Sequence, residues 1–501
     1  MCLGGSHQNR IMDTDRIEQP DVLSPQASRS LLMRKSQVKP DIEKNDLCDI
    51  NTHTEQTRPV KSGKKMPSFI EDDGIVYPEG GLKAWIVIFG CFCGFIPVFG
   101  MLNTIGVIET YVGKNQLSDV SSSTVGWVFS IYSFVNFASC IFSGTYFDRN
   151  GAKLPLVVGS LFHVGGLFGM ANSTRLWHFI LSFSILTGLG NGILMSPLVS
   201  VPSHYFLARR GTATAVATTG GSIGGIMYPL ILRKFFAMHQ GSSDFYGFVW
   251  GIRTLAFINM FLLLIAMSLA RERLPHKDLS EEEKAIPVWR RILNTYFVRS
   301  FDIFAFKELK YAFCVFGTLF GEISIITGIT YFGSYAMKQG MKESTTYLLF
   351  MVINIAGIPG RWLPGIFSDI FGRFNVAIFT LSILTLLTFV MWLPFANSEG
   401  VLFAFSALYG FFSGSIFSIL PVCCGQISKT EEFGRRYSTM YFVVAFGTLV
   451  AVPISGAIIG TDKSSAGYDH YVIWCGVTSF VSASCYFISK TIAVGFNRSR
   501  F

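Results

Sequence analysis

Long apolar segments alternate with short polar gaps along most of the chain after residue 80. A helix that crosses a bilayer needs about 20 mostly apolar residues, and twelve runs of that length can be placed. The predicted spans are residues 84–111, 124–147, 154–172, 177–199, 211–233, 248–270, 311–337, 345–367, 374–396, 400–422, 434–459 and 470–492. The pattern predicts an all-α membrane protein with twelve transmembrane helices.

The polar segments divide the chain into four parts. Residues 1–78 lack a periodic apolar face, and we expect them to form a disordered cytoplasmic tail. Residues 79–270 and 311–501 hold six spans each, which predicts two six-helix bundles, the second with a short cytoplasmic tail. The charged stretch 271–310 is predicted to be a cytoplasmic linker, and its part near Pro287 to Phe297 could form a helix along the membrane surface.

Composition excludes a soluble fold, because half of the residues are hydrophobic, 15% are charged and 48 are Phe. The net charge of +9 is spread over loops rather than gathered on one face. We therefore interpret it as a determinant of orientation and expect no nucleic-acid partner. The cations cluster at Arg149 with Lys153, Arg209 with Arg210, residues 271–310, Arg373, and Lys429 with Arg435 and Arg436. With twelve spans these clusters share one side, which predicts that both termini are cytoplasmic.

A short motif follows the second span and recurs after the eighth. The copies are Gly144-Thr-Tyr-Phe-Asp148-Arg149-Asn-Gly151 and Gly365-Ile-Phe-Ser-Asp369-Ile-Phe-Gly372-Arg373. In each copy a Gly lies one helical turn before an Asp, and a second Gly permits a tight turn. A second correspondence pairs Arg209-Arg210-Gly211 with Gly434-Arg435-Arg436, before spans five and eleven. These repeats indicate two duplicated halves around a central cavity.

The repeated aspartates are the candidate gating residues. Asp148 can accept hydrogen bonds from backbone amides at a neighbouring helix N-terminus, or pair with a cation. We predict that Asp148, Arg149, Asp369 and Arg373 latch the cytoplasmic side shut. The alternative for Arg149 is a role in topology alone.

The repeated loop resembles the signature loop of the major facilitator superfamily. Two further motifs are similar to those of monocarboxylate-transporter-like proteins, with the Trp one residue later than in animal members, as in fungal ones. They are Pro78-Glu79-Gly80-Gly81-Leu82-Lys83-Ala84-Trp85, and Tyr205-Phe206 with Arg209-Arg210 before span five. The resemblance covers residues 78 to 495 and implies a secondary transporter of the major facilitator fold, which moves a small organic solute by alternating access.

The resemblance also bears on the solute. Animal members that carry lactate with a proton use a Lys in span one, and an Asp with an Arg one turn later in span eight. Here Asn103 stands at the Lys position, Gly357 at the Asp position, and the Arg remains as Arg361. The two neutral positions disfavour a lactate–proton symporter. We expect a riboflavin-type vitamin or another organic solute, with proton-coupled monocarboxylate symport as the first alternative and a transporter-like nutrient sensor as the second.

Polar side chains within the spans supply the candidate solute site. A charge at membrane depth costs several kcal/mol unless it is paired or hydrated, so Arg361 and Glu322 are functional candidates. Glu322 could neutralise Arg361 or carry a proton; a structural pair without solute contact is the competing interpretation. Asn103 and Asn354 could offer neutral hydrogen bonds in the cavity, or simply join helices. These four residues form the predicted substrate-binding set.

Other classes of site find little support in the sequence. Cys423 and Cys424 are adjacent, which is unsuitable for zinc, so we expect neither a metal nor a cofactor. The chain has no G-x-x-x-x-G-K-[ST] phosphate loop and no catalytic triad at usable spacing, so we expect no enzyme. The expected partners are the solute, the bilayer and, for a symporter, protons, with no protein partner required. We expect the plasma membrane; the vacuolar or another internal membrane is the alternative.

Overall fold

The structure is a computed structural model that describes residues 69–70, 76–237, 246–274, 287–298, 300–460, 464–496 and 501. The chain divides into a unit of residues 1–63 and a unit of residues 64–501. The first unit, and with it most of the predicted tail, lies outside the described residues.

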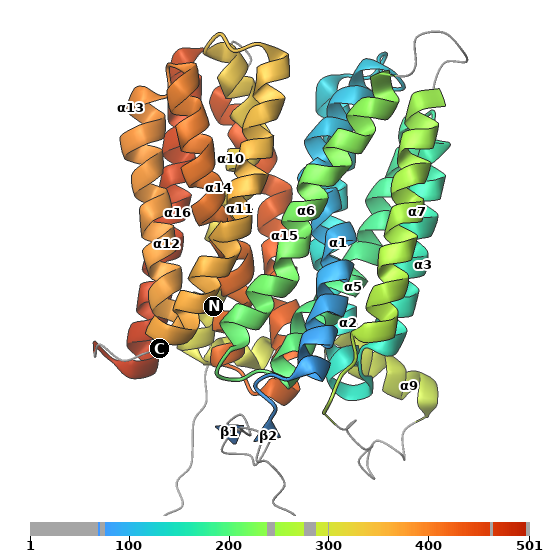
Figure 1. Cartoon of the computed structure of the whole chain (residues 1–501), viewed down its shortest axis with the longest axis vertical. Helices are drawn as coiled ribbons and strands as arrows, with labels where there is room; N and C mark the ends of the chain where they lie inside the picture. Colours follow the sequence, from blue (N-terminus) through green and yellow to red (C-terminus); the bar gives the residue numbers. More distant parts are fainter. Residues whose placement is uncertain are drawn as a thin grey trace, which may run out of the picture. The chain divides into compact units, whose positions relative to one another are not determined.

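The N-terminal half holds six membrane-length helical segments (Figure 1). The short strands β1 (Phe69–Ile70) and β2 (Val76–Tyr77) pair antiparallel before them. The helices are α1 (Leu82–Lys114), α2 (Ser122–Asn150), α3 (Lys153–Ala171), α4 (Leu176–Phe179), η1 (Ile180–Thr187), α5 (Gly188–Ser200), η2 (Val201–His204), α6 (Arg210–Ala237) and α7 (Tyr246–Leu269). The elements α4, η1, α5 and η2 form one continuous segment.

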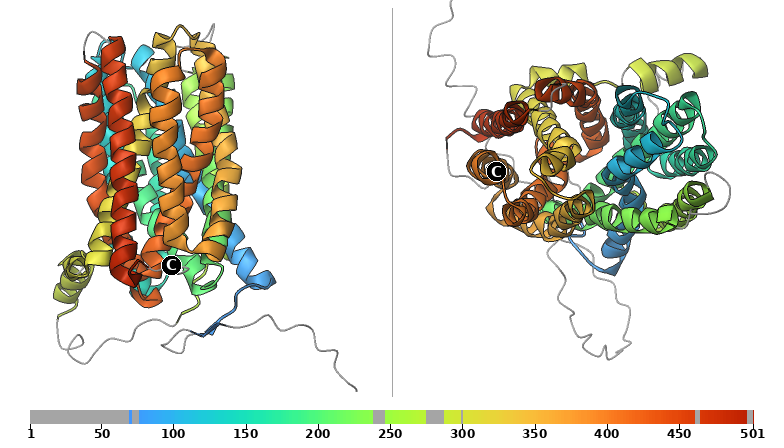
Figure 2. Two further views of the ribbon diagram at one scale, coloured as in Figure 1. Left: turned by 90° about the vertical axis from the view of Figure 1, so that its left-hand side faces the viewer. Right: turned by 90° about the horizontal axis from the view of Figure 1, so that it is seen from above.

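The C-terminal half holds six more such segments, and viewed from above the two halves form two groups of helices (Figure 2). The connection carries α9 (Val288–Leu293), η3 (Asn294–Val298) and η4 (Ile303–Lys307). The helices are α10 (Leu309–Lys338), α11 (Glu343–Phe371), α12 (Arg373–Leu387), η5 (Thr388–Trp392), α13 (Leu393–Phe395), α14 (Glu399–Gln426), η6 (Thr430–Glu432), α15 (Phe433–Ile459) and α16 (Ser465–Val494).

The described residues contain 12 helical segments long and apolar enough to cross a membrane. This confirms the predicted all-α fold with twelve spans, whose ends agree with the predicted ranges to within about five residues. Spans four and nine each include a wider π-helical stretch, η1 and η5. Run length alone carries no signal for such a local widening.

The segment between the bundles contains the short helix α9 within the region where a surface helix was predicted. Figure 1 shows α9 at the lower end of the N-terminal half, oriented across the long helices. Trp289 is 63% exposed, and Tyr296 of η3 packs on Tyr146 of α2 with ring centroids 5.4 Å apart. An exposed Trp beside a basic residue is typical of a membrane interface.

Buried polar side chains join the helices of the N-terminal bundle. Asn191 of α5 donates to the Val98 carbonyl of α1 at 3.2 Å and to the Tyr132 hydroxyl of α2. Asn259 of α7 contacts His163 Nε2 of α3 at 2.9 Å and accepts from Tyr228 of α6. The two clusters take one residue from each span, and such interhelical bonds stabilise the bundle as one body.

The C-terminal bundle contains a cluster of buried aromatic rings around Trp392. Trp392 is fully buried and contacts five rings at centroid distances of 4.9 to 6.2 Å. The contacting rings belong to Phe332, Tyr335, Phe405, Tyr409 and Tyr471. Offset and edge-to-face contacts of this kind add to the energy of burial.

The two bundles approach each other closely at paired glycines. A Cβ on Gly144 of α2 would lie 2.2 Å from the Gly434 carbonyl oxygen of α15, and one on Gly211 of α6 would lie 2.7 Å from the Gly365 carbonyl oxygen of α11. Real Cβ atoms do not approach a carbonyl this closely. Both crossings therefore require glycine. Small residues are typical of sites where the backbones of two membrane helices come into contact.

We expect Gly144→Ala to lower the thermal stability of the purified protein, because the added methyl group must push α2 away from the α15 backbone. Gly165→Ala in α3 is the matched control, since a Cβ there meets nothing within 4 Å. The melting temperature in detergent should fall by several degrees for Gly144→Ala and stay unchanged for the control. Equal melting temperatures for the two variants would contradict the close crossing.

Candidate functional site

Asp148 lies at the end of α2 and reaches the other bundle. Its carboxylate accepts hydrogen bonds from the backbone N–H groups of Gly434, at 2.9 Å, and Arg435, at 2.7 Å. These groups belong to the first turn of α15, where backbone donors have no partner within the helix and the helix dipole favours negative charge. Asp148 therefore caps a helix of the opposite bundle, which is one of the two arrangements considered for it from the sequence.

Asp369 repeats this arrangement from the other half. Its carboxylate accepts from the backbone N–H groups of Gly211 and Thr212, each at 2.8 Å, and from the Thr212 hydroxyl at 2.7 Å. These donors stand at the start of α6 in the N-terminal bundle. The two aspartates thus form a matched pair of contacts, here called the aspartate latches.

The cations of the repeated motif occupy different environments. Arg373 donates to the Leu207 carbonyl in the loop before α6, so it also crosses between bundles. Arg149 is half-buried at the end of α2. The end of the molecule that carries these two residues with Arg209 and Arg435 is called the basic end below.

Arg361 lies in α11 at the contact between the bundles. Its side chain is 3% exposed and donates to the Thr218 carbonyl of α6. The guanidinium faces the rings of Phe99 and Phe417, 5.9 and 5.3 Å from their centroids. Its Nε has no hydrogen-bond partner among the described residues. A buried guanidinium between aromatic rings with one donor unused is suited to receive a polar, planar ligand.

Glu322 of α10 is fully buried, but no ion pair among the described residues joins it to Arg361. The Tyr441 hydroxyl of α15 donates to Glu322 Oε1 at 3.0 Å, while Oε2 has no partner there. Tyr441 in turn packs on Phe137 of α2, with centroids 5.4 Å apart. Glu322 therefore bonds to Tyr441 of its own bundle, and Tyr441 in turn packs against the opposite bundle.

Asn103 and Asn354 come together around Gly225 of α6. A Cβ on Gly225 would lie 2.4 Å from Asn354 Oδ1 and 3.0 Å from Asn103 Nδ2. Asn103 donates to the Gly221 carbonyl at 3.2 Å, and Asn354 to the Phe350 carbonyl at 3.0 Å. Both side chains are half-buried. The contact of α1, α6 and α11 is thus bordered by Asn103, Asn354 and Arg361. Glu322 lies apart from it, beside α15.

Gly357 lies between Asn354 and Arg361 along α11. A Cβ there would meet Ser222 Oγ of α6 at 3.4 Å and the Gly410 carbonyl oxygen of α14 at 3.5 Å. These are ordinary contact distances. Gly357 therefore faces the opposite bundle without any charge, at the position where a proton-coupled lactate carrier is expected to hold an acid.

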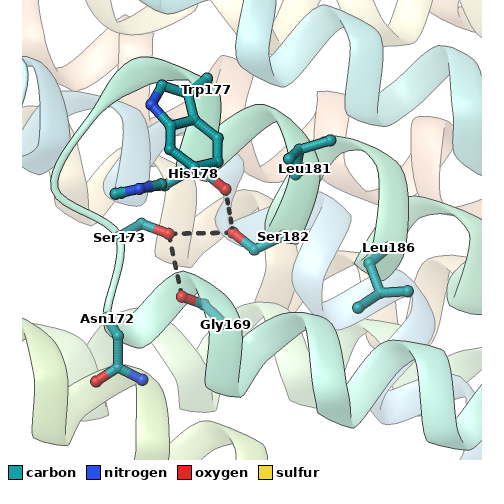
Figure 3. A pocket seen from close by; sticks show the side chains of 8 residues that line it. All are labelled: Gly169, Asn172, Ser173, Trp177, His178, Leu181, Ser182 and Leu186. Carbon is teal, nitrogen blue, oxygen red and sulfur yellow. Dashed lines mark hydrogen bonds between the residues drawn. The ribbon is translucent and has the colours of Figure 1, made fainter.

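A cavity of about 310 Å³ lies away from these residues, between the end of α3 and the segment α4–η1 (Figure 3). Trp177, Leu181 and Leu186 line it, and the hydroxyls of Ser173 and Ser182 lie 3.1 Å apart at its edge. It is lined by one bundle only, at the end opposite to the basic end. None of the predicted site residues lines this cavity.

Sequence reasoning missed one inter-bundle residue, Arg210, and one anchor within the N-terminal bundle, Glu79. Arg210 was assigned only to a motif, yet it is 2% exposed and donates to the Gly425 carbonyl of the C-terminal bundle at 2.8 Å. Glu79 was noted only as the acid of its motif, yet its carboxylate accepts from backbone N–H groups before α6. A glycine directly follows each of these two residues in the sequence, and that was the available signal. No metal cluster occurs among the described residues.

Comparison with known proteins agrees with this architecture. A sequence model of the Major Facilitator Superfamily matches residues 84–451. The riboflavin transporter MCH5 of Saccharomyces cerevisiae is 58% identical over 425 residues, 85% of this chain and 81% of that protein. The MFS-type transporter 1 of an Ophiocordyceps species is 30% identical over 416 residues, 83% of this chain and 86% of that protein.

Solved structures share the fold at low sequence identity. The human organic anion transporter MFSD10 superposes with a TM-score of 0.60 at 13% identity, over 82% of this chain and all of its own. The proton:xylose symporter XylE gives 0.58 at 14% identity, over 82% of this chain and 95% of its own. The resemblance drawn from the motifs is confirmed, as is the expectation of a transporter rather than an enzyme. With a family match across most of its twelve spans, this chain belongs to the major facilitator superfamily of membrane transporters.

Proposed function

We propose that this chain carries riboflavin, or a closely related planar vitamin, across a membrane by alternating access. The observation that carries the proposal is the 58% identity to the yeast riboflavin transporter over 85% of the chain. The polar side chains of Asn103, Asn354 and Arg361 between the bundles support the proposed substrate. Riboflavin is uncharged and planar, with hydrogen-bonding groups along one ring edge and on its hydroxylated side chain.

The candidate site offers chemistry that suits such a solute. Asn103 and Asn354 supply carboxamides on facing helices, which can both donate and accept. Arg361 supplies an unused donor between two phenylalanine rings. With Gly357 in place of an acid, the pair of charges that the resemblance implies for lactate–proton symport is incomplete. A neutral aromatic solute is therefore favoured over a small carboxylate.

We infer further that the basic end faces the cytoplasm, because Lys and Arg concentrate in cytoplasmic loops. Both termini then lie on the cytoplasmic side, and the latches hold the carrier closed toward the cytoplasm. Solute would enter from the opposite end, and release would require both latches to open. The plasma membrane is the location we propose.

Uptake of labelled solutes tests the substrate. In cells that lack and overexpress the protein, we expect overexpression to raise saturable riboflavin uptake and to leave lactate, pyruvate and nicotinate uptake unchanged. Each solute is measured at two external pH values, which reports proton coupling in the same experiment. Strong lactate uptake driven by low external pH would instead favour the monocarboxylate symporter, and riboflavin binding without uptake would favour the nutrient sensor.

We expect Arg361→Gln to reduce riboflavin transport at least tenfold, because loss of one charge-assisted hydrogen bond costs about 1.5–3 kcal/mol. The control is Arg253→Gln at the other end of the molecule, where Arg253 donates to Asn172 and stacks on Trp250. Initial uptake rates are compared at equal surface abundance, and thermal stabilisation by riboflavin reports binding separately. Normal transport and normal stabilisation in Arg361→Gln would remove Arg361 from the site.

We expect Asp148→Asn and Asp369→Asn to open the basic end more often, because the amide has one acceptor fewer and no charge for the helix N-terminus. A cysteine at buried Ser438, which faces Gly144, reports opening by maleimide labelling in a background lacking Cys2, Cys48 and Cys485. Labelling should rise about tenfold, since each cap contributes about 0.5–2 kcal/mol.

Glu308→Gln is the control for this measurement. Glu308 lies before α10 and pairs within its own bundle with Arg436, at 2.6 Å, and that bond lowers the pKa of the Glu308 carboxyl. Its substitution should leave labelling unchanged. A reagent that cannot cross membranes should fail to label intact cells. Labelling from outside would place the basic end on the external face and contradict the proposed orientation.

A further inference from the structure

The segment before α1 reaches across to the C-terminal bundle. Tyr77 ends strand β2, and its side chain is fully buried. Its hydroxyl donates to Thr430 Oγ1 at 2.9 Å. Thr430 begins η6 in the connection between α14 and α15. A residue that precedes every span of the N-terminal bundle therefore bonds to a loop of the other bundle.

The same segment is fastened to the N-terminal bundle at Glu79. The Glu79 carboxylate accepts backbone hydrogen bonds from Leu207 at 2.6 Å, Ala208 at 2.7 Å and Arg209 at 3.1 Å. Its own N–H donates to the Tyr205 carbonyl at 3.2 Å. Glu79 adopts φ +51°, a left-handed conformation that costs free energy in a residue with a side chain. These bonds make the segment move with the N-terminal bundle.

Thr430 also receives a donor from α6. Arg210 donates from one terminal nitrogen to Thr430 Oγ1 at 3.0 Å and from the other to the Gly425 carbonyl at 2.8 Å. The guanidinium also lies over the Phe433 ring, 5.9 Å from its centroid. Tyr77 and Arg210 thus converge on one hydroxyl of the opposite bundle. This contact uses the α14–α15 connection, whereas the aspartate latches use the first turns of α6 and α15.

We propose that Tyr77 and Thr430 form a third inter-bundle lock, with Glu79 as its anchor and Arg210 as its second donor. Opening the basic end carries the anchored segment away from η6, so the bond from Tyr77 to Thr430 has to break in each transport cycle. Tyr77 is a positioning residue in this scheme. It sets the equilibrium between closed and open states without touching the solute.

The test compares two tyrosines at the basic end. Tyr77→Phe removes a hydroxyl that crosses between bundles, while Tyr205→Phe removes one that bonds within a bundle, to the Arg271 carbonyl at 3.1 Å. With the Ser438→Cys reporter, we expect Tyr77→Phe to raise the maleimide labelling rate about fivefold, the factor that corresponds to one net hydrogen bond. Tyr205→Phe should leave it unchanged. An unchanged rate in Tyr77→Phe, or an equal rise in both variants, would overturn the proposal.

A second pair of variants separates the lock from a loss of folding. Thr430→Val should raise the labelling rate, and adding Tyr77→Phe to it should raise the rate by a smaller factor than Tyr77→Phe does alone, because the shared acceptor is already gone. Thr430→Ser retains the hydroxyl and should label as slowly as the unsubstituted protein at equal surface abundance. An undiminished effect of Tyr77→Phe in the Thr430→Val background would refute the shared contact. The assay contains no solute, so its outcome does not depend on the riboflavin proposal.

Discussion

A carboxylate on one bundle caps the first turn of a helix on the other, and this contact joins the two bundles at the basic end. Asp148 and Asp369 make it in opposite directions, each with two backbone N–H groups. The hydrogen bonds require the helices to touch, and the glycines one turn before each aspartate permit that approach. Glycine and aspartate therefore act as one unit, which explains why the same spacing occurs in both halves.

The sequence predicted the spans well because their signal is local. A run of apolar residues of sufficient length forms a helix wherever its neighbours lie, and the alternation of such runs with polar gaps required no knowledge of packing. The capping role of Asp148 was also within reach, because an aspartate at a helix end has few partners. Which helix it caps depended on how the two halves meet.

The partners of other residues could not be assigned from the sequence, because they too depend on how distant segments pack together. Arg361 was identified as a buried charge, but the hydrogen-bond partner of Glu322 depends on how α10 and α15 pack together, and that partner is Tyr441. Glu79 lies far from residues 207–209 in the chain and meets them only because α1 and α6 pack together. Tyr77 had no recognisable pattern at all. Long-range pairing of this kind depends on tertiary structure rather than on composition or periodicity.

The contacts that Asp148, Asp369 and Arg210 make between the bundles at the basic end are hydrogen bonds. In the proposed opening of this end, water enters, and each freed N–H, carboxylate and hydroxyl exchanges a protein partner for water. The net loss is then about 0.5–1.5 kcal/mol for a typical bond, far below the 4–6 kcal/mol of the same bond in an apolar medium. A contact made of such bonds can consequently part and re-form by thermal motion, because hydration compensates for most of the free energy of each bond.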